Sequence, residues 1–378
     1  MNDVFSIIYA DQGSPELREL ISLRSVSALP LAGRYRIIDV LLSNLANSGI
    51  HNVGLITQRN YKSLMDQVGS GKAWDMSSKI GGLMMLPPYD LDANPGQYHS
   101  ACDAIFAKRD YINHQRQNYV LVLGTACVYR QDYKAMMDEL TRTGADLAIL
   151  GSRSDRLMAD GTSNAAFMRV DDEGYITDIT YEPYSPAGYI ESLEAVLIRK
   201  NTLVRLVEDA CSEGRYGFVK DVLAPAIKQY KAICVMHEGY AASVTSVKAY
   251  FDLNNDMLDP NVRRKVFFGD KPVFTKSHDA PPVRFARGCQ VSDSLIANGC
   301  DIRGRVANSV LFRGVSVDED ADVENCIIMS NTKVGKGAHL RNMIIDKDVT
   351  IIEGARRVAF PDSPLIITKG SVVEGVNA

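Results

Sequence analysis

Several sequence features that identify other classes of protein are absent from this 378-residue chain. No apolar run approaches the ~20 residues that a membrane-spanning helix needs. The seven cysteines include no C-x-x-C pair and the six histidines no H-x-x-x-H pair, so the usual spacings of zinc and thiol-redox sites are missing. Positive charge is not in excess either, because the chain has 42 Lys and Arg residues and 46 Asp and Glu residues. A net charge of -4 gives no basic surface for nucleic acid or for an anionic membrane.

The amino-terminal residues lack the features of a signal peptide. Asp3 stands where such a peptide carries positive charge, and no small-residue cleavage site follows. We therefore expect a cytoplasmic chain with reduced, mostly buried thiols, no metal site, and no membrane or nucleic-acid partner.

Strand-like apolar runs alternate with amphipathic, helix-like stretches over the first 150 residues. The runs lie at residues 6–9, 53–57, 120–123 and 145–150, and the helical stretches at 39–49, 101–116 and 134–142. This alternation predicts an α/β, Rossmann-like domain with a mixed, mostly parallel sheet. Its ligand crevice is expected at the carboxyl ends of the strands.

The pattern changes after about residue 280, where aliphatic residues return every six positions. One series is Leu311, Val317, Val323 and Met329, and a second, one residue out of phase, is Ile328, Val334 and Leu340. This spacing, with glycines between the runs and no proline between Pro282 and Pro361, predicts a β-helix. A β-sandwich is the alternative, although it requires turn signals every 8–12 residues.

These patterns divide the chain into three parts. We predict an α/β domain at residues 1–255, a connecting segment rich in charge and proline at 256–280, and a β-helix domain at 281–378. Two domains also suit the length, because single cores rarely grow beyond about 250–300 residues.

Five short motifs carry a resemblance to a known family. Residues 30–39 read P-L-A-G-R-Y-R-I-I-D, followed by L-S-N at 42–44, N-S-G-I at 47–50, Y-H-S-A-C-D-A at 98–104 and Y-R-Q-D-Y at 129–133. They resemble P-x-x-G-G-K-(Y/F)-R-I-I-D, L-S-N, N-S-G-I, Y-R-G-T-A-D-A and Y-x-x-D-Y of the ADP-glucose pyrophosphorylase (glucose-1-phosphate adenylyltransferase) family. The resemblance covers essentially the whole chain and implies a nucleotidyltransferase domain followed by a left-handed parallel β-helix.

The resemblance also implies a phosphate-binding loop that this chain does not keep. The family's G-G-x-G-T-R-L aligns with D-Q-G-S-P-E-L, so Asp11 and Gln12 replace the paired glycines and Glu16 replaces the arginine. The lysine of A-K-P-A-V-P-F becomes Val26. Glycines and cations that would help to bind ATP phosphates are thus replaced by residues that carry no positive charge.

The positions that imply metal and sugar-phosphate binding are altered as well. The aspartate of A-G-D-H-I-Y becomes Ala126, and the aspartate of D-V-G-T-x-x-x-Y becomes Ser243. The lysine of F-V-E-K-P becomes Glu182. Nucleotidyl transfer depends on metal and cationic stabilisation of negative charge, so the sequence predicts a chain without catalytic residues or a cofactor of its own. Mg²⁺ is expected only in a catalytic partner subunit.

Other family positions are kept. Asp103 and Ser192, the latter matching the serine of S-M-G-I-Y, could still hold part of a ligand or could be structural hydrogen-bond groups. Arg24, Arg34 and Arg36 flank a stretch where the family binds anionic effectors, which suggests a phosphate or sulfate site. The alternative for these arginines is surface charge with one buried ion pair.

Three functions are compatible with this pattern. The chain most resembles GlgD-type, non-catalytic regulatory subunits, which implies a heterotetramer with a catalytic subunit in glycogen synthesis. An active adenylyltransferase with a rearranged site is the second hypothesis. A hexapeptide acyltransferase is the third, and it is the weakest because His339 is the only histidine in the repeats.

Overall fold

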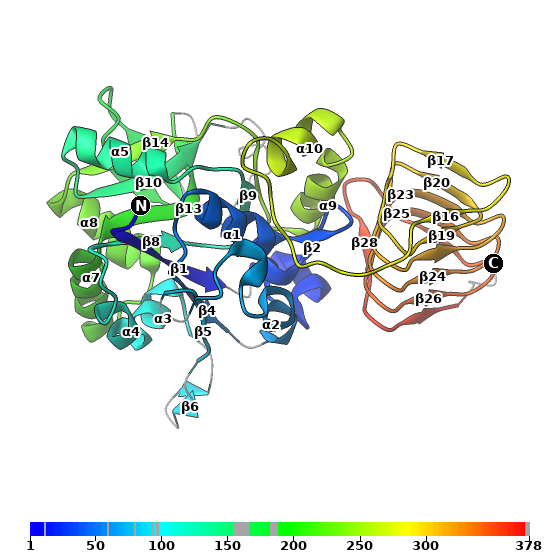
Figure 1. Ribbon diagram of the computed structural model, residues 1–378, viewed down its shortest axis with the longest axis horizontal. Coiled ribbons are helices and arrows are strands. Elements are labelled where there is room, and N and C mark those ends of the chain that lie inside the picture. Colours follow the sequence, from blue (N-terminus) through cyan, green and yellow to red (C-terminus); the bar gives the residue numbers. More distant parts are fainter. Residues whose placement is uncertain are drawn as a thin grey trace.

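The computed structural model describes residues 1–10, 13–58, 60–78, 81–88, 90–91, 94–95, 98–153, 166–181 and 188–374. A helix-covered sheet occupies the amino-terminal part, and a stack of short parallel strands follows it at the carboxyl-terminal end (Figure 1). The predicted fold class, an α/β domain followed by a parallel β-helix, is confirmed.

The central sheet is mixed. Its order is β12-β11-β13-β8-β1-β4-β5, and β10 joins β14 to β13. Neighbouring strands in the order β5-β4-β1-β8 are parallel, and so are β10 and β14. Strand β13 runs antiparallel to its neighbours β8, β10 and β11. The strands are β1 (Val4–Ala10), β4 (Val53–Thr57), β5 (Leu83–Leu86), β8 (Tyr119–Leu123), β10 (Leu147–Ser152), β11 (Phe167–Val170), β12 (Ile176–Thr180), β13 (Ile190–Arg199) and β14 (Ala232–Met236).

Helices cover both faces of this sheet. On β1, Ile8 points into one apolar core and Ile7 into the other, as strand alternation requires. The first core contains α1 (Ile37–Asn47), α2 (Lys62–Val68) and α5 (Lys134–Thr143). The second contains α3 (Ala101–Ala107), α4 (Arg109–Asn113), α7 (Lys200–Ser212) and α8 (Ala224–Gln229).

The single helix predicted at 101–116 is wrong, because the structure has two helices there. The break falls at Lys108, whose φ of -106° is not helical. Its side chain is almost fully buried and the Nζ donates a hydrogen bond to the carbonyl oxygen of Pro87 at 2.6 Å. A buried lysine needs such an acceptor, so this tertiary contact sets the break.

Short elements complete the amino-terminal part. They are η1 (Pro15–Ile21), η2 (Val26–Ala28), β2 (Pro30–Leu31), β3 (Tyr35–Arg36), η3 (Lys72–Trp74), β6 (Asp90–Leu91), β7 (Asn94–Pro95), β9 (Cys127–Tyr129), η4 (Phe218–Leu223), β15 (Ala241–Ser243), α9 (Val247–Asp256) and α10 (Pro260–Phe267). Helix α10 lies within the segment predicted as a connection at 256–280. Its Phe267 stacks on Tyr35 with ring centroids 4.3 Å apart, so this segment packs as part of the fold.

The carboxyl-terminal strands pair only in parallel, coil above coil, which excludes the β-sandwich. They are β16 (Arg284–Phe285), β17 (Gln290–Ser292), β18 (Leu295–Ile296), β19 (Asp301–Ile302), β20 (Arg305–Ala307), β21 (Val310–Leu311), β22 (Ser316–Val317), β23 (Asp322–Ile328), β24 (Lys333–Val334), β25 (His339–Ile345), β26 (Thr350–Ile351), β27 (Arg356–Val358), β28 (Leu365–Ile367) and β29 (Val372–Val373).

The register explains why the six-residue series changes phase. Val317 pairs with Val334 and Val334 with Ile351, so each of these coils has 17 residues, one fewer than three hexapeptides. In the row of aliphatic side chains that fills the inside of the β-helix, Ile328 therefore follows Val323 after five residues instead of six. Met329, which the spacing placed in this row, instead joins the apolar core between the two domains. That assignment was wrong because a strict period of six was assumed.

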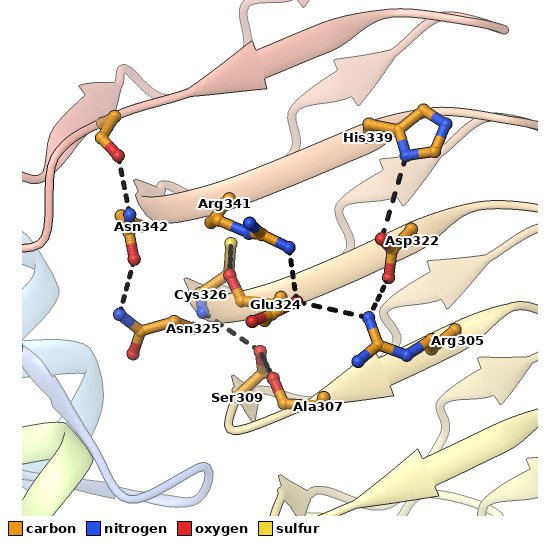
Figure 2. A network of polar contacts seen from close by, with 11 residues as sticks. Arg305, Ala307, Ser309, Asp322, Glu324, Asn325, Cys326, His339, Arg341 and Asn342 are labelled. Atoms are coloured by element: carbon orange, nitrogen blue, oxygen red, sulfur yellow. Dashed lines mark hydrogen bonds and ion pairs between the residues drawn. The ribbon is translucent and has the colours of Figure 1, made fainter.

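Polar ladders run along the outside of the β-helix (Figure 2). At one corner, Asn325 and Asn342 have φ angles of 52° and 58°, and the Asn325 Nδ2 donates to the Asn342 Oδ1 at 2.6 Å. On the adjoining face, Arg341 pairs with Glu324 at 2.7 Å, and the His339 Nδ1 lies 3.8 Å from Asp322. More than half of the His339 side chain is exposed on this outer face.

The two domains share an apolar core. It joins residues of η1, α9 and α10 to outward-facing side chains of the β-helix such as Val310, Phe312 and Ile327. Arg24 and Asp346 form an ion pair inside this contact, with both side chains about 5% exposed. The contact is therefore a packed interface of the fold, with a charged pair sealed in it.

Candidate functional site

The two positions that lack the expected metal aspartates lie side by side. Strands β9 and β15 pair antiparallel with Cys127 opposite Ser243. The Val244 N–H donates to the carbonyl oxygen of Ala126 at 2.6 Å. The structure thus brings together two positions far apart in the sequence, beside the carboxyl end of β8, where α/β sheets bind their ligands.

A glutamate from the antiparallel strand β13 occupies the space next to Ala126. The Oε2 of Glu194 accepts a hydrogen bond from the Ala126 N–H at 3.0 Å, and its carbonyl oxygen accepts one from the Gly124 N–H at 2.8 Å. The φ of Glu194 is 55°, a left-handed conformation that favours glycine. In the motif S-M-G-I-Y this third position is glycine, so the replacement was visible in the sequence and was missed.

Gly124 makes room for this carboxylate. A Cβ added to Gly124 would lie 2.1 Å from the Glu194 Oε2, far inside van der Waals contact. The corresponding family residue in A-G-D-H-I-Y is alanine. Glycine at 124 and glutamate at 194 therefore both differ from the family motifs and fit each other sterically, with the Glu194 carboxylate next to Ala126.

Substituting Gly124 tests whether the two changes depend on each other. Gly124→Ala is expected to lower the free energy of unfolding by about 1–3 kcal/mol, because the added methyl group clashes with the carboxylate. Glu194→Gly, which removes the carboxylate and relaxes the backbone, should restore most of that loss in the double variant. Urea denaturation of the four proteins in the cycle measures this coupling, and additive effects would contradict the paired interpretation.

A second glutamate of β13 lies beside Ser243. Glu191 is 1% exposed, and its Oε1 accepts a hydrogen bond from the Ser243 Oγ at 2.6 Å. Within the described residues its Oε2 has no hydrogen-bond partner. Burial raises the pKa of Glu191 to about 7, and the neighbouring Glu194 adds to this rise.

This raised pKa predicts a pH-dependent contribution to stability. In the folded chain Glu191 stays protonated up to about pH 7, whereas in the unfolded chain it loses its proton near pH 4.5. The folded state therefore binds one more proton between these pH values, and the free energy of unfolding falls as the pH rises from 4.5 to 7. Glu191→Gln removes that decrease. Relative to the parent chain, its free energy of unfolding should therefore increase across this window, by up to about 3 kcal/mol.

Denaturation of both proteins at several pH values between 4.5 and 8 measures this difference. Glu353→Gln, at an exposed position of the β-helix, is the matched control for the loss of one carboxylate. A constant difference between Glu191→Gln and the parent across the pH range would show that Glu191 titrates normally.

The residues at this site do not fit Mg²⁺. Ala126 offers a methyl group, and the Oε2 of Glu194 is already bound to a backbone N–H. The Oε1 of Glu191 is likewise engaged by a hydroxyl donor. Across the described parts of the chain, no group of three or more His, Cys, Asp or Glu side chains is arranged to hold a metal ion. An octahedral oxygen shell of the kind Mg²⁺ demands is not formed by these side chains.

Five other positions differ from the family motifs, namely Asp11, Gln12, Glu16, Val26 and Glu182. Asp11, Gln12 and Glu182 lie outside the described residues. Glu16 is exposed on η1. Val26 is 1% exposed in the apolar core between the domains, so its position is closed to a charged ligand.

Asp103 and Ser192 have structural partners. Both carboxylate oxygens of Asp103 accept backbone hydrogen bonds, from His99 at 2.6 Å and Ser100 at 2.7 Å, which caps helix α3. The Oγ of Ser192 accepts a bond from the Glu194 N–H at 3.3 Å, and its own N–H donates to Ala166. These contacts support the structural alternative for both residues.

The three arginines of the predicted effector site separate in the structure. Arg24 is buried in its pair with Asp346, and the Arg36 Nη1 donates to the carbonyl and hydroxyl oxygens of Ser63 at 2.6 and 2.7 Å. Arg34 is exposed, with its guanidinium 5.3 Å from the Tyr35 ring centre. The buried-ion-pair alternative therefore describes Arg24.

A cavity between the domains collects positive charge around Arg34. It has a volume of about 440 Å³, and its basic lining residues are Arg34, Arg263, Lys276, His278 and Arg313. Burial lowers the pKa of His278, and the nearby Arg313 and Lys276 lower it further. Burial likewise lowers the pKa of Arg313, with Arg34 adding to it. Cations held this close together favour an anionic ligand.

Comparison with known proteins agrees with the fold and the motifs. A nucleotidyl transferase profile matches residues 15–258, and the GlmU-like, C-terminal hexapeptide profile matches residues 281–358. Among the described residues, none of the helices combines the length and the hydrophobicity that a bilayer-spanning segment requires.

Full-length relatives give the same result. The glucose-1-phosphate adenylyltransferase of Bacillus thuringiensis (strain Al Hakam) is 32% identical over 348 residues, covering 91% of this chain and 92% of the relative. Those of Bacillus anthracis and Bacillus mycoides (strain KBAB4) are 32% and 31% identical with the same coverage. Together with the two profiles and the shared motifs, these matches establish that the chain belongs to the glucose-1-phosphate adenylyltransferase family.

Proposed function

We propose that this chain is a catalytically degenerate, regulatory subunit of a glucose-1-phosphate adenylyltransferase. The observation that carries the proposal is the replacement of both metal aspartates, at Ala126 and Ser243, together with the Glu194 carboxylate beside the first of them. The reaction assigned to the relatives needs cationic stabilisation of phosphate, and this site offers the opposite charge.

The electrostatic penalty is large. One carboxylate ~4 Å from a phosphate charge is unfavourable by about 4 kcal/mol at an effective dielectric constant of 20. Glu194 lies next to Ala126 and Glu191 next to Ser243, the two positions that lack the aspartates. Even one such repulsion would weaken phosphate binding by more than a hundredfold.

The intact scaffold supports a role in assembly. The shared apolar core and the sealed Arg24–Asp346 pair hold the two domains together although the catalytic residues are gone. The last coils of the β-helix expose Val358 (58%), Phe360 (79%) and Val372 (64%). Exposed apolar side chains beside unpaired strand edges suit contact with another subunit. A catalytic subunit that keeps both aspartates and binds Mg²⁺ is the partner in this proposal, in a heterotetramer that synthesises ADP-glucose for glycogen.

The cationic cavity supports regulation by a small anion. A phosphate-bearing effector would contact Arg34, Arg313 and His278 between the two domains. Binding of inorganic phosphate, followed by calorimetry, is expected to weaken in Arg313→Ala and to stay unchanged in Arg356→Ala, an exposed arginine on the outer β-helix face. Equal affinity in all three proteins would place the anion elsewhere.

An active enzyme with a rearranged site is the second candidate. The proximity of Glu191 to Ser243 favours it, because two carboxylates stand near the two lost aspartates. Turnover of ATP and glucose 1-phosphate by the chain alone would decide for this candidate.

Assembly with a catalytic subunit is the direct test of the proposal. The chain is mixed with a glucose-1-phosphate adenylyltransferase that keeps both aspartates, from the same organism, and the molar mass is measured by light scattering. A mixed complex is expected. Phe360→Glu should weaken it by placing a charge in the exposed apolar patch, whereas Gln290→Glu, at an exposed position in the first coils, is the matched control. Two separate species at micromolar concentrations would contradict the proposal.

A further inference from the structure

Two thiols away from the degenerate site are in contact. The Sγ atoms of Cys102 and Cys211 lie 3.6 Å apart, although 109 residues separate them in the chain. All seven cysteines are free, and no other pair of cysteine sulfurs in the described chain makes such a contact. The pair joins the second core of the α/β domain, between α3 and α7.

The two helices fix both sulfurs. Cys102 lies in the first turn of α3, where its N–H donates to the Oγ of the cap residue Ser100 at 2.9 Å. Cys211 lies in the last turn of α7, which packs against α3 (Figure 1). Beyond α7 the chain turns at Gly214, with a φ of 70°, into exposed residues. Because a disulfide needs an S–S distance of about 2.05 Å, the approach required is small, and this exposed helix end can supply it.

We propose that Cys102 and Cys211 are an oxidative modification site that forms a reversible disulfide with a peroxide as oxidant. The Cys211 thiolate attacks one peroxide oxygen, the O–O bond breaks, and the hydroxide that leaves takes a proton to become water. The Cys102 sulfur then attacks the sulfenic sulfur of Cys211, and the S–O bond breaks. Its hydroxide takes the Cys102 proton and forms a second water. Together the two thiols lose two electrons, and one molecule of hydrogen peroxide is reduced to two molecules of water.

The surroundings set the order of events. Cys211 is partly exposed and Cys102 is fully buried, so the oxidant reaches Cys211 first. Burial raises the pKa of both thiols, and the carboxylate of Asp103 adds to the rise at each. The thiolate is therefore scarce at neutral pH, and the bond should form slowly rather than by the rapid chemistry of an activated thiol.

The bridge would also stabilise the α/β domain. It closes a loop of more than one hundred residues and ties the start of α3 to the end of α7. Restricting the unfolded chain in this way is expected to raise the melting temperature by about 5–10 °C.

The experiment uses the full chain, treated with hydrogen peroxide and then alkylated under denaturing conditions. We expect two of the seven thiols to disappear, the intact mass to fall by two hydrogen atoms, and a peptide pair linking Cys102 to Cys211 that dithiothreitol separates. Cys211→Ser should abolish the loss of two thiols. Cys289→Ser, which removes another partly exposed cysteine, should not affect the bridge.

Other products would overturn the proposal. These are oxygen addition at Cys211 without a bridge, a disulfide between other cysteines, or a disulfide between two chains. The peptide map of the unsubstituted protein gives this answer even if a serine variant fails to fold.

Discussion

Replacing Arg24 by alanine is expected to lower the free energy of unfolding by about 3–5 kcal/mol. The Arg24 Nη2 contacts both oxygens of Asp346 at 2.8 and 2.6 Å, and its Nη1 points to the Met329 sulfur at 3.4 Å. Truncation leaves the Asp346 carboxylate buried without its counterion. The loss comes from that uncompensated charge, since the net stabilisation by an intact buried pair is small.

Two further variants separate these effects in urea denaturation. The double change Arg24→Met with Asp346→Leu removes both charges at similar volume and should recover most of the stability. Arg341→Ala breaks a half-exposed pair with Glu324 on the outer β-helix and should change stability by at most about 1 kcal/mol. A small effect of Arg24→Ala, similar to that of Arg341→Ala, would show that the domain contact does not depend on this pair.

The isolated chain is expected to form ADP-glucose at least about a thousandfold more slowly than a relative that keeps both aspartates, because several charge-stabilising groups are lost together. Ala126→Asp alone should not restore the rate. This is because Ser243 and the altered phosphate loop would remain, and the effects on the rate of residues that act together in catalysis are not additive. The measurement is pyrophosphate release from ATP and glucose 1-phosphate with Mg²⁺.

The control for this assay is the intact relative, tested at the same concentration and in the same buffer. Reproducible turnover by the unsubstituted chain, in a preparation free of any catalytic subunit, would contradict the proposal and favour the rearranged-site hypothesis.

Local patterns predicted the layers of the fold but not strand β13. Its sequence, I-E-S-L-E-A-V-L-I-R, carries Glu191 and Glu194 in its first half, so it does not read as a buried strand. It is nevertheless the strand that makes the sheet mixed, because it pairs antiparallel with β8, β10 and β11. The acidic side chains that obscure this strand in the sequence are the ones that contact Ala126 and Ser243.

Contacts distant in sequence could not be derived from the chain alone. Nothing near Arg24 indicates that it pairs with Asp346, 322 residues away, and three neighbouring arginines were equally consistent with an open anion site. The contact between Cys102 and Cys211 is likewise set by the packing of two helices. By contrast, the departures from the family motifs at Ala126 and Ser243 could be read from the sequence, because each is a single position within a specific pattern.

We propose that this chain activates a catalytic partner without catalysing the reaction itself. The most direct test is the initial rate of ADP-glucose formation by the catalytic relative, measured alone and with increasing amounts of this chain. A coupling of about 1–3 kcal/mol, typical of regulatory interactions, corresponds to a rise in rate or substrate affinity of about 5–150-fold that saturates as the mixed complex forms. An unchanged rate at saturating amounts of this chain would contradict the regulatory role.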